Sequence, residues 1–278
     1  MKQIETIHLF PELSTELISL LKGLDIEEWE KHSSIAGRTV KDLASHILDG
    51  SLRRLSLQRD KFSDNSRETN IKSYSELVSY IQDLNKEWIL ANRRLSPKIL
   101  IDLLEYSEKQ VFDFFKSLNM SDKALFSVAW AGESESKNWF DIAREFNEKW
   151  HHQMQIRLAL DKPPIMDKKY IEPLYDTFML GLPFHYKDLT NYKKGLTIKI
   201  TLTGILNKSW YLQKQTEQWS LIENHSIKTD VSIKLPDNIA WILFTNTDRN
   251  KEKYKSVINI EGDNKLGLKL IDFVAVMS

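Results

Sequence analysis

The sequence predicts an all-α up-and-down four-helix bundle followed by a small α+β domain. Up to about residue 163, apolar side chains recur at three- and four-residue spacing over long segments, as in amphipathic helices. From Gly195 onward, short segments alternate apolar and polar side chains, which is typical of half-buried strands. We therefore expect a helical domain at residues 1–163, a connector at 164–194 and a second domain at 195–278.

Several signals set the expected helix ends in the first domain. Thr39 is a plausible N-cap, with Asp42 where a capping box usually has Glu. The short break before Pro97 favours antiparallel neighbours. Asn138 is expected to cap the last helix, after a loop at 128–137, and Pro163 with Pro164 to end it. The helices predicted on this basis are Pro11–Lys22, Thr39–Arg59, Ser73–Arg94, Pro97–Leu118 and Trp139–Leu160.

The second domain is predicted to mix short strands and helices. A helical turn around Ile171–Leu180 is expected in the connector before it. The expected strands are Thr197–Thr203, Trp210–Leu212, Trp219–Ile222, Val231–Ile233 and Val257–Ile260. The expected helices are Asn238–Phe244 and Asp263–Phe273. Strands and helices in this order indicate an α+β domain.

Composition excludes several kinds of chemistry. The 278 residues contain 39 Lys and Arg, 39 Asp and Glu, and no Cys. The absence of Cys excludes disulfides, thiolate metal ligands and a cysteine nucleophile. A formal charge of zero gives no reason to expect nucleic acid or an anionic membrane as a partner. Because we find neither a secretory signal nor an apolar run of about 20 residues, we expect a cytoplasmic protein.

One pair of residues on the last predicted helix is suited to metal binding. Glu148 and His152 are four residues apart, so both lie on one helix face. His151 is three residues from Glu148 and is the less favoured alternative. His46, in the middle of the second helix, offers a third ligand from a different helix, as in other bundle sites. An ordinary polar pair and a hydrogen-bonded interior histidine explain the same residues without a metal.

Two motifs resemble those of the DinB / mycothiol-dependent maleylpyruvate isomerase superfamily. The segment GRTVKDLASH, from Gly37 to His46, resembles the family's opening pattern Trp-Thr-Val-x-Asp-x-x-x-His, with Arg38 in place of Trp. Glu148 and His152 match its later Glu-x-x-x-His pattern. The resemblance implies that His46, Glu148 and His152 bind one divalent metal ion, usually zinc, with nickel, iron and manganese as alternatives.

The resemblance extends over nearly the whole chain. Residues 85–97 and Ile156-Arg157 also look like the maleylpyruvate isomerase branch. The stretches Ile198–Gly204 and Val257–Asp263, with Trp210 and Trp219, resemble the sterol-carrier-protein-like module that follows the bundle in that branch. The implied fold is thus a DinB-like bundle with a sterol-carrier-protein-like domain.

The resemblance also implies a metal-dependent transferase or isomerase that uses a low-molecular-weight thiol. The metal would activate the cofactor thiol for attack on a small electrophile, since this chain has no sulfur nucleophile of its own. Two alternatives stay open: a hydrolase with a metal-bound water, and a non-catalytic metal- or ligand-binding protein. The expected partners are thus a small-molecule electrophile and a thiol, with a monomer or homodimer as the assembly.

Four further residues are candidates for the site on weaker grounds. Arg157, one helical turn beyond the ligands, is a candidate for contact with an anion, although a surface or salt-bridged arginine is the favoured reading. Trp130, Trp139 and Trp150 are candidates for lining a pocket, but aromatic residues at helical spacing more often lie in the core.

Overall fold

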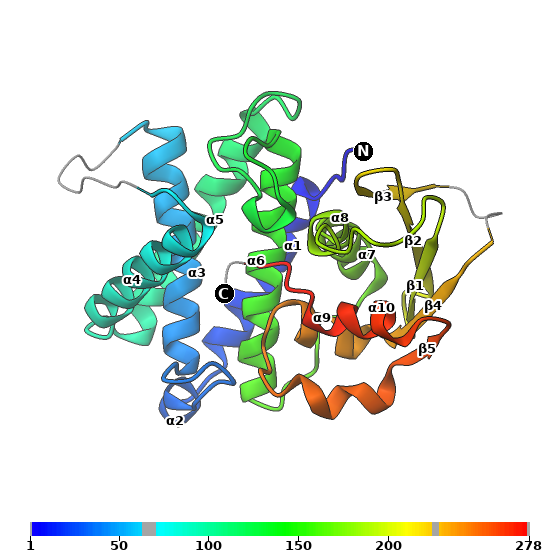
Figure 1. Ribbon diagram of the computed structural model, residues 1–278. Helices are drawn as coiled ribbons and strands as arrows, with labels where there is room; N and C mark the ends of the chain where they lie inside the picture. The colour runs from blue at the N-terminus through cyan, green and yellow to red at the C-terminus, as the bar shows by residue number, and fades with distance from the viewer. Residues whose placement is uncertain (1, 63–70, 224–227, 277–278) are drawn as a thin grey trace. The chain divides into compact units, whose positions relative to one another are not determined.

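The computed structural model describes residues 2–62, 71–223 and 228–276. It forms two compact units (Figure 1). The helical unit comprises residues 1–127 and 135–164, and the mixed unit comprises residues 128–134 and 165–278. A helical first part followed by a mixed α/β part confirms the predicted fold class.

The helical unit is built on five long helices. They are α1 (Phe10–Lys22), α3 (Val40–Arg54), α4 (Tyr74–Asn92), α5 (Pro97–Ser117) and α6 (Asn138–Ala159). The central helix α3 packs against α4, α5 and α6, while α1 packs against α5 and α6. The predicted second helix extended to Arg59, and the chain indeed continues helically there, but as a π-helix over Leu55–Arg59. The predicted helices therefore agree with the observed ones to within a few residues.

The predicted start of α3 is confirmed in detail. The Thr39 hydroxyl accepts a hydrogen bond from the Asp42 backbone N–H at 3.2 Å, and the Asp42 carboxylate accepts one from the Thr39 N–H at 3.1 Å. The buried Asp42 carboxylate also pairs with Arg93, at 2.8 Å. These contacts satisfy backbone groups that the first helical turn leaves without partners, so the helix that carries His46 begins at a defined residue.

Two local features of the helical unit differ from expectation. Asn138 does not cap α6 but is its first residue, and its side chain donates a hydrogen bond to the Asn119 carbonyl. The prediction was wrong because the segment around Asn119 packs against this helix start and takes the amide for itself. A short helix, α2 (Ile26–Glu30), was not predicted, although a capping box between Asp25 and Glu28 begins it.

The mixed unit contains a five-stranded sheet in the order β3-β2-β1-β4-β5. The central strands β1 (Thr197–Thr203) and β4 (Val231–Pro236) are parallel, and the other pairs are antiparallel. The remaining strands are β2 (Lys208–Lys214), β3 (Trp219–Ile222) and β5 (Asn259–Glu261). Ile198, Ile200 and Leu202 are fully buried on one face of β1, as the alternation predicts.

The helices of the mixed unit follow the prediction with some changes. They are α7 (Lys168–Met179), α8 (Leu182–His185), α9 (Asp237–Phe244) and α10 (Asn264–Leu268). The connector thus holds a full helix, α7, rather than the predicted turn. The predicted closing helix, Asp263–Phe273, is present as α10 followed directly by a 3-10 helix at Lys269–Asp272.

The last strand is shorter than predicted and shifted along the chain. Residues 251–257 form a 3-10 helix, so Val257 lies before the strand. β5 then pairs with three residues of β4 only. Gly262 ends the strand with φ +98°, and a Cβ there would lie 2.3 Å from the Asp230 carbonyl oxygen. This close approach requires glycine, which explains the abrupt turn after Glu261.

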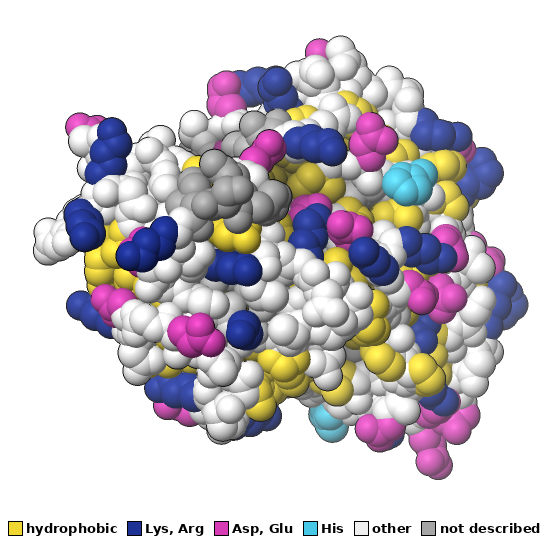
Figure 2. Space-filling view, turned by 90° about the vertical axis from the view of Figure 1, so that its right-hand side faces the viewer, with side chains coloured by type: hydrophobic (Ala, Val, Ile, Leu, Met, Phe, Trp, Pro, Cys, Tyr) yellow, Lys and Arg dark blue, Asp and Glu magenta, His cyan; other side chains and the backbone are white. Residues whose placement is uncertain are grey.

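The surface shows no separation of charge on the face drawn in Figure 2. There, the basic and acidic side chains are interspersed with polar and apolar ones. This mixture agrees with the equal numbers of Lys plus Arg and Asp plus Glu. Among the described residues, no helix is both long enough and apolar enough to cross a membrane.

Replacement of the α3 cap tests its contribution to stability. We expect Thr39→Ala to lower the free energy of unfolding by about 1 kcal/mol, because the Asp42 N–H loses its acceptor. Thr39→Ser keeps the hydroxyl oxygen and should lie much closer to wild type. Urea unfolding of the metal-free proteins measures both, and equal stability of the Ala and Ser variants would contradict the assignment.

Candidate metal centre

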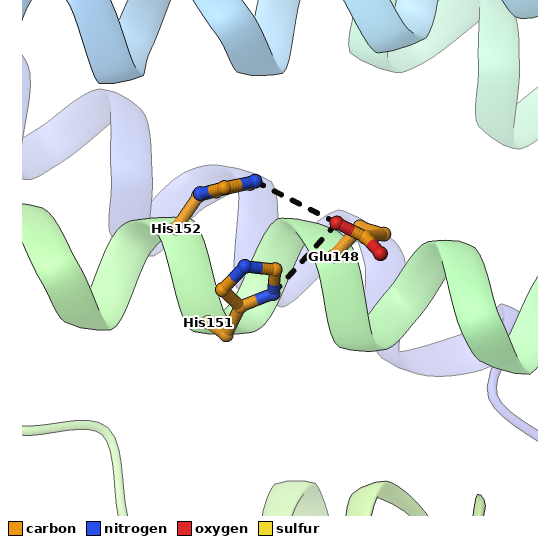
Figure 3. A group of neighbouring side chains, drawn as sticks. All are labelled: Glu148, His151 and His152. Carbon is orange, nitrogen blue, oxygen red and sulfur yellow. Dashed lines mark ion pairs between the residues drawn. The ribbon is translucent and has the colours of Figure 1, made fainter. Parts of the chain in front are cut away.

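The helix α6 brings an acidic side chain and two histidines together. The Glu148 Oε2 atom lies 3.6 Å from His152 Nε2 and 3.9 Å from His151 Nδ1. Figure 3 shows both imidazoles next to the Glu148 carboxylate, and the two rings lie 3.9 Å apart, centroid to centroid. One potential ligand atom from each of the three residues lies within 4.8 Å of the others. The spacing that predicted a shared face for Glu148 and His152 thus yields a compact donor cluster.

His46 reaches the same cluster from α3. Its ring lies 4.5 Å from that of His152, centroid to centroid, with the ring planes nearly perpendicular. The charge of Glu148 also acts on His46, which places the carboxylate in its surroundings. The structure therefore places His46 of α3 beside His152 of α6. The group whose ligand atoms all lie within 4.8 Å of one another comprises Glu148, His151 and His152, without His46.

Hydrogen bonds distinguish His152 from His151. His151 Nδ1, the nitrogen nearest Glu148, lies 2.9 Å from the Asn147 carbonyl oxygen. A carbonyl only accepts, so this nitrogen carries the proton and has no lone pair for a metal. His152 engages Gln155 through Nδ1 at 2.8 Å, and its Nε2 faces Glu148. The geometry therefore favours His152 as the ligand next to Glu148.

Burial sets the protonation states of the cluster. Burial, together with the neighbouring His152, holds the pKa of His46 well below 6.5, so its imidazole is neutral. Burial raises the pKa of Glu148, but His152, His151 and Arg144 outweigh this effect and lower it to about 2. A neutral imidazole at His46 and an ionised carboxylate at Glu148 are the forms in which these side chains bind a metal.

The donor set fits a divalent cation. His46, His152 and Glu148 would supply two nitrogens and one carboxylate, a set that suits zinc with an open position as well as non-haem iron, nickel or manganese. His152 is 15% exposed and Glu148 23%, so the cluster is sheltered without being sealed. With three protein ligands, a tetrahedral metal ion would keep one position for a ligand from solution.

A buried ionic network lies beside the cluster and joins α3, α5 and α6. Arg54 pairs with Asp141 and with Glu145, the latter at 3.0 Å, and all three side chains are at least nine-tenths buried. Lys149 donates to Glu108 and to Ser51, each at 2.6 Å. Each described charge in this network has a partner of opposite sign, as buried charges require.

This network fixes how α3 lies against α6. Arg54, near the end of α3, meets residues near the start of α6, whereas His46 meets His152 further along. The helices are therefore antiparallel at this contact. From His46 to Arg54 the rise is about 12 Å, and from Glu145 to His152 it is about 10 Å, so the two contacts share one register. A shift of α3 along α6 by one helical turn would break the contacts of Arg54 with Glu145 and of His46 with His152.

Sequence reasoning missed the network and a second charged pair near the site. Asp49 is 4% exposed and lies 2.9 Å from Arg53, and Arg53 also donates to Asn85 of α4. Burial raises the pKa of Asp49 to about 6 despite this pair. The sequence could have indicated this pair, because Asp49 and Arg53 follow His46 by three and seven residues and so lie on the same helix face.

The weaker candidates lie elsewhere. Arg157 donates to the Pro163 carbonyl at 3.0 Å and to Glu16 at 2.8 Å. It is therefore a salt-bridged arginine, which is the interpretation that the sequence favoured over contact with an anion. Trp150 is fully buried, and Trp139 is 8% exposed and stacks on Phe140. Trp130 belongs to the mixed unit, where it packs against Gly181. These three aromatic residues are core residues.

The depressed pKa of His151 predicts how pH affects folding. Burial and the nearby His152 lower this pKa from 6.5 to about 3. Between pH 6.5 and about 3, the unfolded chain binds a proton at His151 and the folded protein does not. The free energy of unfolding therefore falls as the pH falls through this range. We expect His151→Gln to reduce the slope of unfolding free energy against pH by about one proton.

Urea unfolding of the metal-free proteins at a series of pH values measures this slope. The raised pKa of Asp49 acts in the opposite sense below about pH 6. This effect of Asp49 is the same in wild type and in His151→Gln, so it cancels when the slopes of the two proteins are compared. An unchanged slope in the variant would mean that His151 titrates normally in the folded protein.

Comparison with known proteins bears on the fold. No protein-family model matches the chain, and no curated protein matches its sequence. Two crystal structures of mycothiol-dependent maleylpyruvate isomerase, one of a histidine-to-alanine mutant, match with a TM-score of 0.52 and 13% identity, over 94% of this chain and 96% of theirs. A ubiquinone synthesis protein, UbiJ-SCP2, aligns with 37% of this chain and 96% of its own at 12% identity, with a TM-score of 0.25 that is too low to indicate a shared fold. The chain thus has the fold of mycothiol-dependent maleylpyruvate isomerase.

Proposed function

We propose that the protein is a metal-dependent transferase or isomerase of the maleylpyruvate isomerase type that uses a low-molecular-weight thiol. The observation that carries the proposal is the meeting of His46 from α3 with Glu148 and His152 from α6, on a fold shared with that isomerase. At 13% identity the likeness supports the fold alone, so the activity rests on the chemistry of the cluster.

The cluster is well suited to a thiol. A divalent metal lowers the pKa of a bound thiol, so that the nucleophilic thiolate is present near neutral pH. Histidine binds a metal in its neutral form, so His46, His152 and the Glu148 carboxylate would together leave one net positive charge on a divalent metal, which favours an anionic further ligand. The chain contains no cysteine, so the sulfur has to come from a separate molecule.

The residues around the cluster support this role by holding charge and position. Arg144 forms ion pairs with Asp141 and Glu145. Its charge adds to the effect of His152 and His151 in lowering the pKa of Glu148. Arg53 and Asp49 lie along the same face of α3 as His46. Their charges provide polar surroundings for a small electrophile, whose identity we assign only by class.

Substitution of the ligands tests the metal site. We expect the wild-type protein to bind about one equivalent of a divalent metal, with zinc the first choice, and His46→Ala or His152→Ala to abolish this binding. His151→Ala is the matched control and should retain it, because His151 Nδ1 is engaged by a backbone carbonyl. Elemental analysis after dialysis against each metal gives the stoichiometry.

Two results would contradict this assignment. Full occupancy in the His46→Ala, His152→Ala double variant would mean that the metal binds elsewhere. Loss of metal in His151→Ala together with retention in His46→Ala would shift the site to Glu148, His151 and His152, which lie within 4.8 Å of one another.

Assays with and without a thiol test the reaction. We expect the zinc-loaded protein to accelerate addition of a bacterial low-molecular-weight thiol to an unsaturated acid, and to lose this activity when either thiol or metal is omitted. Glu148→Gln should reduce the rate at least tenfold, because the metal loses an anionic ligand. Turnover of esters or amides without any thiol would support a hydrolase instead, and metal binding without turnover would support a binding protein.

A further inference from the structure

We propose that Gln155 is a positioning residue that sets the tautomer of His152 and thereby the affinity of the centre for its metal. The inference rests on the metal site proposed above. It concerns a residue that takes no part in binding the metal directly and that the spacing of potential ligands does not reveal.

Gln155 is placed for this role by the helix itself. It follows His152 by three residues on α6, so both side chains lie on one face. Its Oε1 atom lies 2.8 Å from His152 Nδ1, and the residue is 1% exposed. A buried amide in direct contact with the imidazole cannot exchange this partner freely for water, so the contact constrains the ring.

The contact decides which imidazole nitrogen is free. When Gln155 presents its oxygen, Nδ1 carries the proton, and the lone pair of Nε2 points toward Glu148, 3.6 Å away. If the amide presented its nitrogen instead, Nδ1 would accept, and Nε2 would carry the proton into the space between His152 and Glu148. Only the first arrangement leaves His152 ready to bind a cation.

The three histidines differ in how they are held. A backbone carbonyl fixes His151 through Nδ1. A side chain, Gln155, holds His152. Among the described residues, no hydrogen bond to the His46 ring is found. The orientation of His152 therefore depends on one replaceable group, and it is the histidine that faces both Glu148 and His46.

The chemistry of the partner predicts how substitutions act. A group that accepts from the distal nitrogen of a metal-binding histidine fixes its tautomer and raises its basicity, and loss of such a group lowers metal affinity by about 10- to 100-fold. Leucine at position 155 cannot accept. Glutamate can accept, cannot donate when ionised, and adds a negative charge.

The first test needs no metal. Long-range proton–nitrogen correlation spectra of the metal-free wild-type protein, recorded at mildly alkaline pH so that the imidazoles are neutral, report which nitrogen of each histidine carries the proton. We expect the proton of His152 on Nδ1 in wild type and a shift toward Nε2 in Gln155→Leu. A proton on Nε2 in wild type would overturn the proposal.

The second test measures affinity by zinc competition with a chromophoric chelator. We expect Gln155→Leu to bind about 10- to 100-fold more weakly than wild type, and Gln155→Glu to bind at least as tightly. Gln110→Leu is the control, since Gln110 of α5 accepts a hydrogen bond from Arg59 and its replacement should not affect zinc binding. Unfolding curves of the metal-free variants show that each one is folded.

The outcomes separate this inference from the proposed function. Affinity of Gln155→Leu within twofold of wild type, or an equal loss in Gln155→Glu, would overturn the role of Gln155 while leaving the metal site intact. If wild type binds no metal, the proposed function fails, whereas the tautomer of His152 is still decided by the spectra. Because glutamate is nearly isosteric with glutamine, the zinc affinity of Gln155→Glu can be measured even if Gln155→Leu does not fold.

Discussion

The helical unit depends on the pairing of Arg54 with Asp141 and Glu145. Buried charges are tolerated only with partners, because their removal from water costs far more than most single contacts return. Arg54 on α3 can meet both carboxylates on α6 in one register only. That register also places His46 opposite His152, so the network and the candidate metal centre are two consequences of a single helix alignment.

The helix α6 serves both features along one length of chain. Asp141, Glu145 and Lys149 belong to the network, and Glu148 and His152 to the cluster. Lys149 reaches Glu108 and Ser51, so α6 is held to α5 and α3 by charge as well as by packing. In such buried surroundings electrostatic interactions are stronger than in water. Burial holds the pKa of His46 low, and the neighbouring histidines and Arg144 hold the pKa of Glu148 low.

Local contacts refine what the ligand residues can do. The neighbouring histidines 151 and 152 differ in their partners, a backbone carbonyl for one and the Gln155 amide for the other. Both contacts arise within α6, yet residue spacing does not reveal them, because it does not specify which nitrogen of a ring is engaged. Spacing also does not show which group a side chain will bond. Asn138 was expected to cap α6, but its amide donates to the Asn119 carbonyl instead.

The long helices, the Thr39 cap of α3, the shared face of Glu148 and His152, and the alternation of β1 could be predicted from the sequence, because they depend on residues within about one helical turn or two strand positions of each other. The resemblance joined His46 to the pair. The folded structure alone shows that α3 lies against α6 in the register that brings His46 to His152, that β5 pairs through three residues of β4, and that Arg53 reaches Asn85 of α4. These features depend on contacts between segments far apart in the chain, which local periodicity does not encode.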